Sequence, residues 1–139
     1  MVGEISAREI AVSALKAQRV RMNTIAQNLA NIDSVTTPEG GPFRRQLAIL
    51  RAQSARPGQS SGPVGVRVDR VVSDSSPFRT VYNPGHPEAD EAGYVSYPNI
   101  NSAVEMVDLI SAQRAYEAGV AVIASDRRMV QKALEIIQK

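Results

Sequence analysis

The stretch NTIAQNLANIDSVTTPEGGPFRRQ, from Asn23 to Gln46, decides the fold, because helical and strand-like sequence meet in it. Short polar side chains crowd its middle, where they compete for backbone hydrogen bonds and favour caps and turns. Proline and glycine then complete a break. The polar and turn-forming residues are Asn28, Asn31, Asp33, Ser34, Pro38, Gly40, Gly41 and Pro42. We therefore expect one long helix to end near Ala30 and a different structure to begin after Pro42.

The residues before the break predict an amphipathic helix from about Ile5 to Ala30. Neither proline nor glycine interrupts this segment, and alternating spacings of four and three residues mark a narrow seam of heptad type. Gln18 is its one polar position. The other seam residues are Ala11, Leu15, Met22, Ile25 and Leu29. At ~1.5 Å per residue, this helix would be roughly 40 Å long.

A second and stronger helical pattern occupies the end of the chain, from Ser102 to Gln138. Ser102 and Glu105 have the spacing of a capping box, and no proline follows Pro98. The apolar seam residues are Met106, Leu109, Tyr116, Val120, Ile123, Val130, Leu134 and Ile137, with Gln113 and Arg127 as polar breaks. Gly119 lies among alanines in the middle of this helix, where glycine costs ~1 kcal/mol against alanine. We therefore expect a packing reason for Gly119.

The residues between the two helices predict a small β-rich module. All eight prolines lie between Pro38 and Pro98. Four segments have strand character and are separated by turn-rich sequence: residues 43–51, 64–72, 78–82 and 93–98. The serine- and glycine-rich piece at residues 54–63 predicts a flexible loop.

The fold class that we expect is α+β, with the long terminal helices paired as an antiparallel coiled coil and the β-rich module inserted between them. The parts are residues 1–35, 36–98 and 99–139. The C-terminal helix is longer than its partner, so its overhang and the outer helix faces need other chains. The alternative is a monomeric hairpin whose excess helix frays. Aromatic residues make up only 4% of the chain, which agrees with closely packed helices rich in small residues.

The charge of the chain is balanced but unevenly distributed. The net charge is +2, from 16 basic and 14 acidic residues, which gives no argument for nucleic acid. From Arg44 to Arg70 there are six arginines and one acid, whereas from Val71 to Pro98 there are one arginine and four acids. Two interpretations stay open, a solvated surface and head-to-tail complementarity between subunits.

Little in the sequence points to catalysis or to a cofactor. There is no cysteine, and the single histidine, His86, sits in a turn beside Glu88 and Asp90 at spacings that match neither a zinc nor a calcium site. No glycine run fits a phosphate cradle, and no serine lies in a nucleophile elbow. We therefore expect no enzyme, cofactor, metal or small-molecule substrate. We also expect no membrane insertion and no cleaved signal peptide.

The opening stretch resembles the N-terminal signature of the bacterial flagellar basal-body rod proteins. It contains an Asn-Leu-Ala-Asn motif followed by a Pro-Glu-Gly-Gly-Pro-aromatic-Arg-Arg continuation, which is most similar to the proximal rod members of that family. The motif residues are Asn28, Leu29, Ala30, Asn31, Pro38, Glu39, Gly40, Gly41, Pro42, Arg44 and Arg45. The segments NPGHPEADEAGYVSYPNIN and EMVDLISAQRAYEAGVAVI resemble the same family.

The resemblance implies a structural protein of the flagellar rod, the periplasm-spanning drive shaft of the basal body. It implies export through the flagellar type III apparatus, helical assembly with other rod proteins and with copies of itself, and transmission of torque. The terminal helices would form the inner layer of the tube and the middle module would pack outside. Arg44 and Arg45 would then lie near the junction, in reach of a neighbour or of its helix C-termini.

Two alternatives from other classes remain. A binding adaptor would present the β-rich module on a helical hairpin to a single partner and form a stoichiometric complex. A peripheral membrane helix is disfavoured, because the polar face of the first helix mixes acidic and basic residues and carries no aromatic anchor.

Overall fold

The computed structural model describes residues 6–54 and 63–137 of the chain. It contains two helices and four strands, in the order α1 (Ala7–Ala30), β1 (Gln46–Ser54), β2 (Pro63–Ser73), β3 (Arg79–Tyr82), β4 (Tyr94–Tyr97) and α2 (Ser102–Ile137). The strands form two separate two-stranded antiparallel sheets, β1–β2 and β3–β4. The α+β class is therefore confirmed, and all four predicted strand segments are strands.

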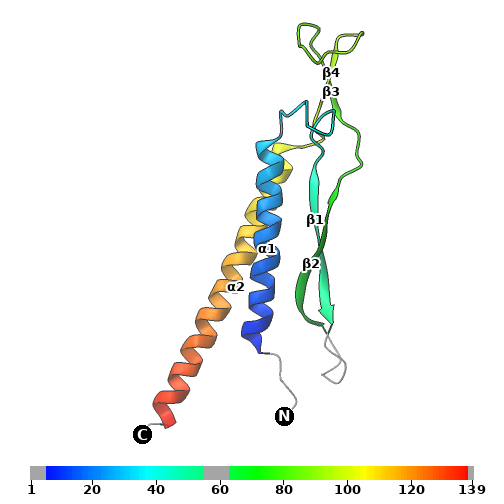
Figure 1. The fold of residues 1–139 in the computed structure, drawn as a ribbon. Coiled ribbons are helices and arrows are strands. Elements are labelled where there is room, and N and C mark those ends of the chain that lie inside the picture. The colour runs from blue at the N-terminus through cyan, green and yellow to red at the C-terminus, as the bar shows by residue number, and fades with distance from the viewer. Residues whose placement is uncertain (1–5, 55–62, 138–139) are drawn as a thin grey trace.

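The elements form an elongated molecule with α1 in a central position (Figure 1). The two helices run side by side in opposite directions, and α1 also contacts both strands of the β1–β2 hairpin. The β3–β4 hairpin lies beyond the end of the helices where α1 finishes, and α2 extends past the start of α1 at the opposite end. The predicted overhang of the second helix is thus present.

Helix α1 begins and ends with side-chain caps. The Ser6 hydroxyl accepts a hydrogen bond from the Glu9 amide, and the Glu9 carboxylate accepts one from the Ser6 amide, both at 3.2 Å. At the other end, the Asn31 amide donates to the carbonyls of Gln27 and Asn28. These interactions satisfy groups that a helix terminus leaves without partners. The predicted end near Ala30 is confirmed.

The turn after α1 needs its two central glycines. Gly40 and Gly41 have φ angles of +92° and +73°, in the left-handed region that side chains with a Cβ rarely adopt. The Thr37 amide donates to the Gly41 carbonyl at 2.9 Å, which closes the turn. The chain thereby reverses direction and enters β1 alongside the helix that it has just left.

The β1–β2 hairpin lies directly against α1. The Ser13 hydroxyl on α1 accepts a hydrogen bond from the Val66 amide of β2 at 3.1 Å. A Cβ atom built on Gly65 would lie 2.5 Å from that hydroxyl oxygen, so the close approach requires glycine there. The predicted flexible loop at 54–63 falls almost entirely outside the described residues.

The core is small and is made mainly of small residues. The buried apolar residues are Ala11, Ala17, Ile25, Val95, Ile100 and Ala112. Only Glu105 and Ala112 are buried among the 36 residues of α2. The described fold therefore buries one side of α1 well and leaves most of α2 open to solvent.

Candidate assembly surface

A buried polar network joins α1, α2 and the start of β1. Asn28 of α1 and Glu105 of α2 are each only 1% exposed. The Asn28 amide nitrogen donates to the Glu105 carboxylate at 3.0 Å and to the Gln46 carbonyl at 2.9 Å. The Gln46 amide in turn donates to the Asn28 side-chain oxygen at 2.9 Å. The Asn28 side chain thus pairs with both the amide and the carbonyl of Gln46, as the backbone of a neighbouring strand would.

Arg45 supplies the positive charge of this junction. Its guanidinium binds Glu105 at 2.5 Å and lies 3.5 Å from carboxylate oxygens of both Asp74 and Asp108. Arg21 of α1 reaches Asp108 at 3.3 Å. Burial alone lowers the pKa of Arg45, but the hydrogen bonds and charges of Glu105 and Asp74 outweigh that effect and raise it. Arg45 therefore stays charged and holds the two helices against the β-rich module.

The buried Glu105 corrects one expectation from the sequence. Ser102 and Glu105 do not form a capping box. The residue that caps α2 is Asn101, whose side-chain oxygen accepts hydrogen bonds from the amides of Ala103 and Val104. Glu105 is turned inward because Arg45 and Asn28 compete successfully for its carboxylate. Asn28 likewise lies within the junction instead of capping the end of α1.

The two arginines that follow the turn bind within the chain, and a further contact of either with a neighbouring subunit stays a prediction. Arg44 donates to the carbonyls of Asp74 and Ser76 at 2.9 Å, and its guanidinium lies 4.1 Å from the centre of the Phe78 ring. The Arg45 amide donates to the Asn99 side chain at 2.9 Å. Of the other motif residues, Leu29 is half-buried, Ala30 is exposed, and Asn31 ends α1. The residues from Pro38 to Pro42 form the exposed turn and its flanks.

The two helices approach each other closely at Gly119. A Cβ atom built there would lie 2.9 Å from Leu15 Cδ2 and 3.2 Å from Leu15 Cγ. The Ala11 carbonyl lies 3.8 Å away. The expected packing reason for this glycine is therefore confirmed, since any side chain on it would push the two helices apart.

The contact stripe of α2 follows a helical spacing of three and four, but it includes small residues. Its buried and half-buried members are Glu105, Leu109, Ala112, Tyr116, Gly119 and Ile123. Leu109, Tyr116 and Ile123 also belong to the seam predicted from the sequence. The seam of large apolar residues does not include Ala112, because close contact between helices requires small residues at such positions. The sequence does predict close packing at Gly119, from its position among alanines.

The predicted seam is therefore divided in the folded chain. On α1, Ala11 and Ile25 are buried, and Leu15, Met22 and Leu29 are half-buried. On α2, five seam residues are exposed: Met106, Val120, Val130, Leu134 and Ile137. The chain itself covers the first group and leaves the second group open. Whether a neighbouring subunit covers these five stays a prediction.

The described residues offer no evident site for other chemistry. Within 6–54 and 63–137, no three His, Cys, Asp or Glu side chains gather closely enough to hold a metal ion. In the same residues, neither helix contains an apolar stretch of the length and hydropathy that crossing a bilayer requires.

The chain matches two family descriptions that concern flagellar rods. Residues 9–37 match the description "Flagella basal body rod protein". Residues 91–136 match the C-terminal region described for the flagellar basal body rod FlgEFG proteins. The first match covers most of α1 and stops before the turn at residues 38–42, and the second covers β4 and most of α2, so together they include both partners of the helix pair.

Three relatives show how far the similarity extends. The flagellar basal-body rod protein FlgC of Yersinia enterocolitica is 45% identical over 130 residues, which cover 94% of this chain and 95% of that protein. The FlgC protein of Borreliella burgdorferi is 41% identical over 152 residues, covering 99% of each. That of Bacillus subtilis is 39% identical over 140 residues, covering 91% and 93%. This chain therefore belongs to the FlgC family of flagellar basal-body rod proteins.

Proposed function

We propose that this chain is a structural, non-catalytic subunit of the proximal rod of the bacterial flagellum. It assembles helically with other rod proteins and with copies of itself, and it transmits torque along the basal body. Membership of the FlgC family supports a place for this chain in the flagellar rod. The exposed apolar surface of the helices supports assembly through contacts between helices.

One observation carries the proposal: the inner face of α2 continues beyond the end of its partner. Tyr116, Gly119 and Ile123 line the face that α1 covers. Residues at the next positions of the same face are Val130, Leu134 and Ile137, which are 54%, 53% and 78% exposed. The same kind of apolar surface is thus covered in one half of the helix and bare in the other. A neighbouring helix in a tube would complete this seam as a coiled coil.

The outer side of α2 adds to this argument. Val107, Ile110 and Met129 point away from the intramolecular contact and are each more than half exposed. Apolar surface of this extent on a single helix marks an interaction site. Helices gain most of their stability from packing, so α2 becomes fully stable only in an assembly. A heterologous contact that does not close into a ring repeats as a helical array.

The three-part division of the chain fits a rod subunit. In this proposal, residues 1–35 and 99–139 form the inner layer of the tube and residues 36–98 lie outside it. The junction of Arg45, Glu105 and Asn28 then links the layers, so that force on one reaches the other. Export through the flagellar type III apparatus brings the subunit to the rod.

The test replaces one bare seam residue with a charge. Leu134→Asp alters only exposed surface, so we expect the free energy of unfolding to change by less than about 0.5 kcal/mol. We expect the variant to be made and exported but to be absent from purified hook–basal bodies, with loss of swimming. The matched control is Ala26→Asp on α1, because Ala26 is exposed and its helix spacing places it with the exposed Arg19, Asn23 and Ala30.

Two outcomes would overturn the proposal. Normal swimming of cells that carry only Leu134→Asp would show that the bare inner face is not an assembly seam. Recovery of the unaltered chain in one soluble stoichiometric complex, and its absence from basal bodies, would favour the adaptor function instead.

A further inference from the structure

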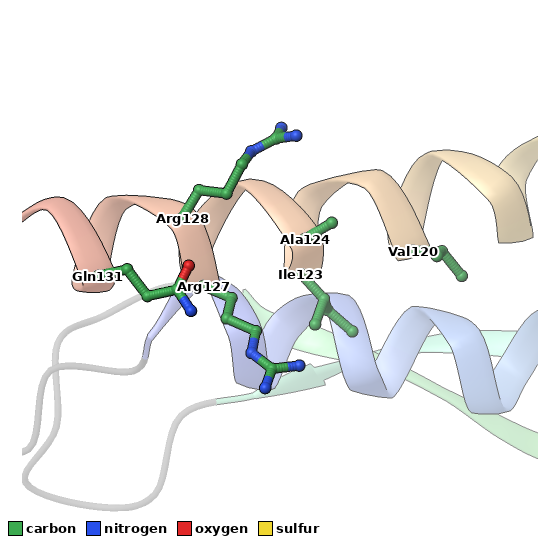
Figure 2. Close-up of a pocket in the computed structure, with 6 residues that line it drawn as sticks. All are labelled: Val120, Ile123, Ala124, Arg127, Arg128 and Gln131. Carbon is green, nitrogen blue, oxygen red and sulfur yellow. The ribbon is translucent and has the colours of Figure 1, made fainter.

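We propose that a basic groove on the overhang of α2 binds the acidic loop of a second copy of this chain, so that successive copies meet end to end. The basic groove is formed by Val120, Ile123, Ala124, Arg127, Arg128 and Gln131 (Figure 2). The acidic loop comprises residues 83–93 between β3 and β4. The inference rests on the proposed rod function, because it names one contact within that assembly.

The basic groove combines an apolar floor with two positive charges. Its volume is about 370 Å³. Ile123 and Arg127 extend toward α1, whereas Arg128 extends from the opposite side of α2 (Figure 2). An adjoining hollow shares Ile123 and Arg127 and adds Arg8, Asp126 and Val130. Among residues 6–54 and 63–137, Arg8, Arg127 and Arg128 form no ion pair. A carboxylate from outside would therefore meet charges that are still available.

The acidic loop presents carboxylates on a backbone that is already ordered. The Asp90 side chain accepts hydrogen bonds from the amides of Ala92 and Tyr94 at 2.9 and 2.8 Å. The Gly93 amide donates to the Asp90 carbonyl at 2.9 Å. Glu88 and Glu91 are exposed and form no ion pair with the described residues. A loop fixed in this way loses little conformational entropy on binding.

The loop also carries apolar side chains of a size that suits a shallow floor. Pro87 and Ala92 are exposed beside the two glutamates. The loop can therefore place small apolar groups over the exposed Val120 and Ala124 while its carboxylates approach Arg127 and Arg128. The match is one of charge and of side-chain size together.

The basic residues of β1 and β2 are a poorer partner for this loop. Arg45 and Arg44 are held at the junction, and Arg51 and Arg70 both pair with Asp69. Among the described arginines of this region, Arg44 and Arg67 make no ion pair, and Arg44 is held by the carbonyls of Asp74 and Ser76. The charge complementarity that the sequence places within the β-rich module is thus largely satisfied inside the chain. Arg127 and Arg128 on α2 and Arg8 at the start of α1 are available positive charges outside this module.

The two surfaces lie at opposite ends of the molecule. The β3–β4 hairpin marks one end and the C-terminal part of α2 marks the other (Figure 1). One copy therefore cannot join its own loop to its own groove without unfolding. A contact between two different patches on two copies is heterologous and can repeat from one subunit to the next. Opposite charges on the patches would set the orientation of each added subunit.

The test uses cross-linking in assembled rods, which is straightforward because the chain has no cysteine. The double variant Glu91→Cys/Arg128→Cys is expressed as the only copy, and purified hook–basal bodies are treated with a short bismaleimide. The control is Glu91→Cys/Arg114→Cys, which moves the second thiol along α2 toward the junction. We expect about tenfold more cross-linked multimers of this chain than in the control, a ratio equivalent to about 1.4 kcal/mol.

A second experiment exchanges the charges of the two surfaces. Arg127→Glu/Arg128→Glu and Glu88→Lys/Glu91→Lys should each reduce swimming, and the variant with all four changes should restore it. Equal cross-linking in both cysteine variants overturns the end-to-end contact, as does failure of the fourfold variant to recover. If the unaltered chain is present in basal bodies, equal cross-linking or failed recovery excludes only the end-to-end contact and leaves the proposed rod function in place. If it is absent from them, the proposed rod function fails as well.

Discussion

The two ends of α2 have opposite character, although the same helix connects them. At its start, Glu105 is buried and binds Arg45 and Asn28. Toward its end, Val130, Leu134 and Ile137 are each more than half exposed. The first end is specified by polar groups that have partners within the chain. The second is apolar and lacks such partners. The comparison indicates that the junction is complete in the single subunit and that the overhang is completed by assembly.

The largest expected effect concerns the junction. Glu105→Gln removes the buried carboxylate and leaves the half-buried guanidinium of Arg45 without its nearest charge partner. Loss of one member of a buried ion pair typically costs about 3 kcal/mol or more. We expect a fall of about that size in the free energy of unfolding, measured by urea titration with far-ultraviolet circular dichroism. A loss below about 1 kcal/mol would mean that the junction does not define the fold of this end.

The next effect concerns the helix contact between the two ends. Gly119→Val places a branched side chain against Leu15 and overpacks the contact, with an expected loss of about 2 kcal/mol. Ala118→Val is the control, because Ala118 is exposed on the same helix. If both variants lose the same amount, the effect arises from helix propensity and not from the close approach of the helices.

A smaller effect, of opposite sign, is expected at Gln18. Its side-chain oxygen is buried and accepts no hydrogen bond from the described residues. An unsatisfied buried polar atom costs about 1–3 kcal/mol. Gln18→Leu should therefore raise the free energy of unfolding by about 1 kcal/mol and raise the melting temperature. No change, or a loss of stability, would show that water or another group already satisfies that oxygen.

The smallest effect is the response of the junction to acid. Hydrogen bonds from Ser76, together with the charge of Arg45, hold the pKa of Asp74 below its ordinary value of 3.8. A carboxylate with a lowered pKa in the folded state stabilises the fold above its unfolded pKa, and that contribution disappears as the pH falls through the folded value. Asp74→Asn should therefore lose less stability than the unaltered chain on acidification below about pH 4. Identical pH profiles would contradict this role.

Much of the fold could be predicted from the sequence because its elements carry strong local signals. The breaker residues from Asn31 to Pro42 fixed the end of α1, and the strand segments are separated by proline and glycine. The antiparallel arrangement followed from two long helices joined by a short module. Whether the helix pair has coiled-coil geometry stays a prediction.

The junction could not be predicted in the same way, for a physical reason. Asn28 lies near the end of α1 and Glu105 near the start of α2, where helix capping would explain each residue type as well as a role in the junction does. Only the three-dimensional arrangement brings Arg45 between them. Gly119 could be flagged as unusual, but Ala112 and the shifted contact stripe could not, because close packing of small residues leaves no pattern of apolar bulk.

The most direct test compares the accessibility of the overhang before and after assembly. Leu134→Cys introduces the only thiol of the chain, and its rate of reaction with a maleimide is measured in the isolated protein and in purified hook–basal bodies. We predict rapid labelling of the isolated protein and strong protection in the basal bodies. Equal labelling in both would contradict the claim that assembly covers the bare inner face of α2.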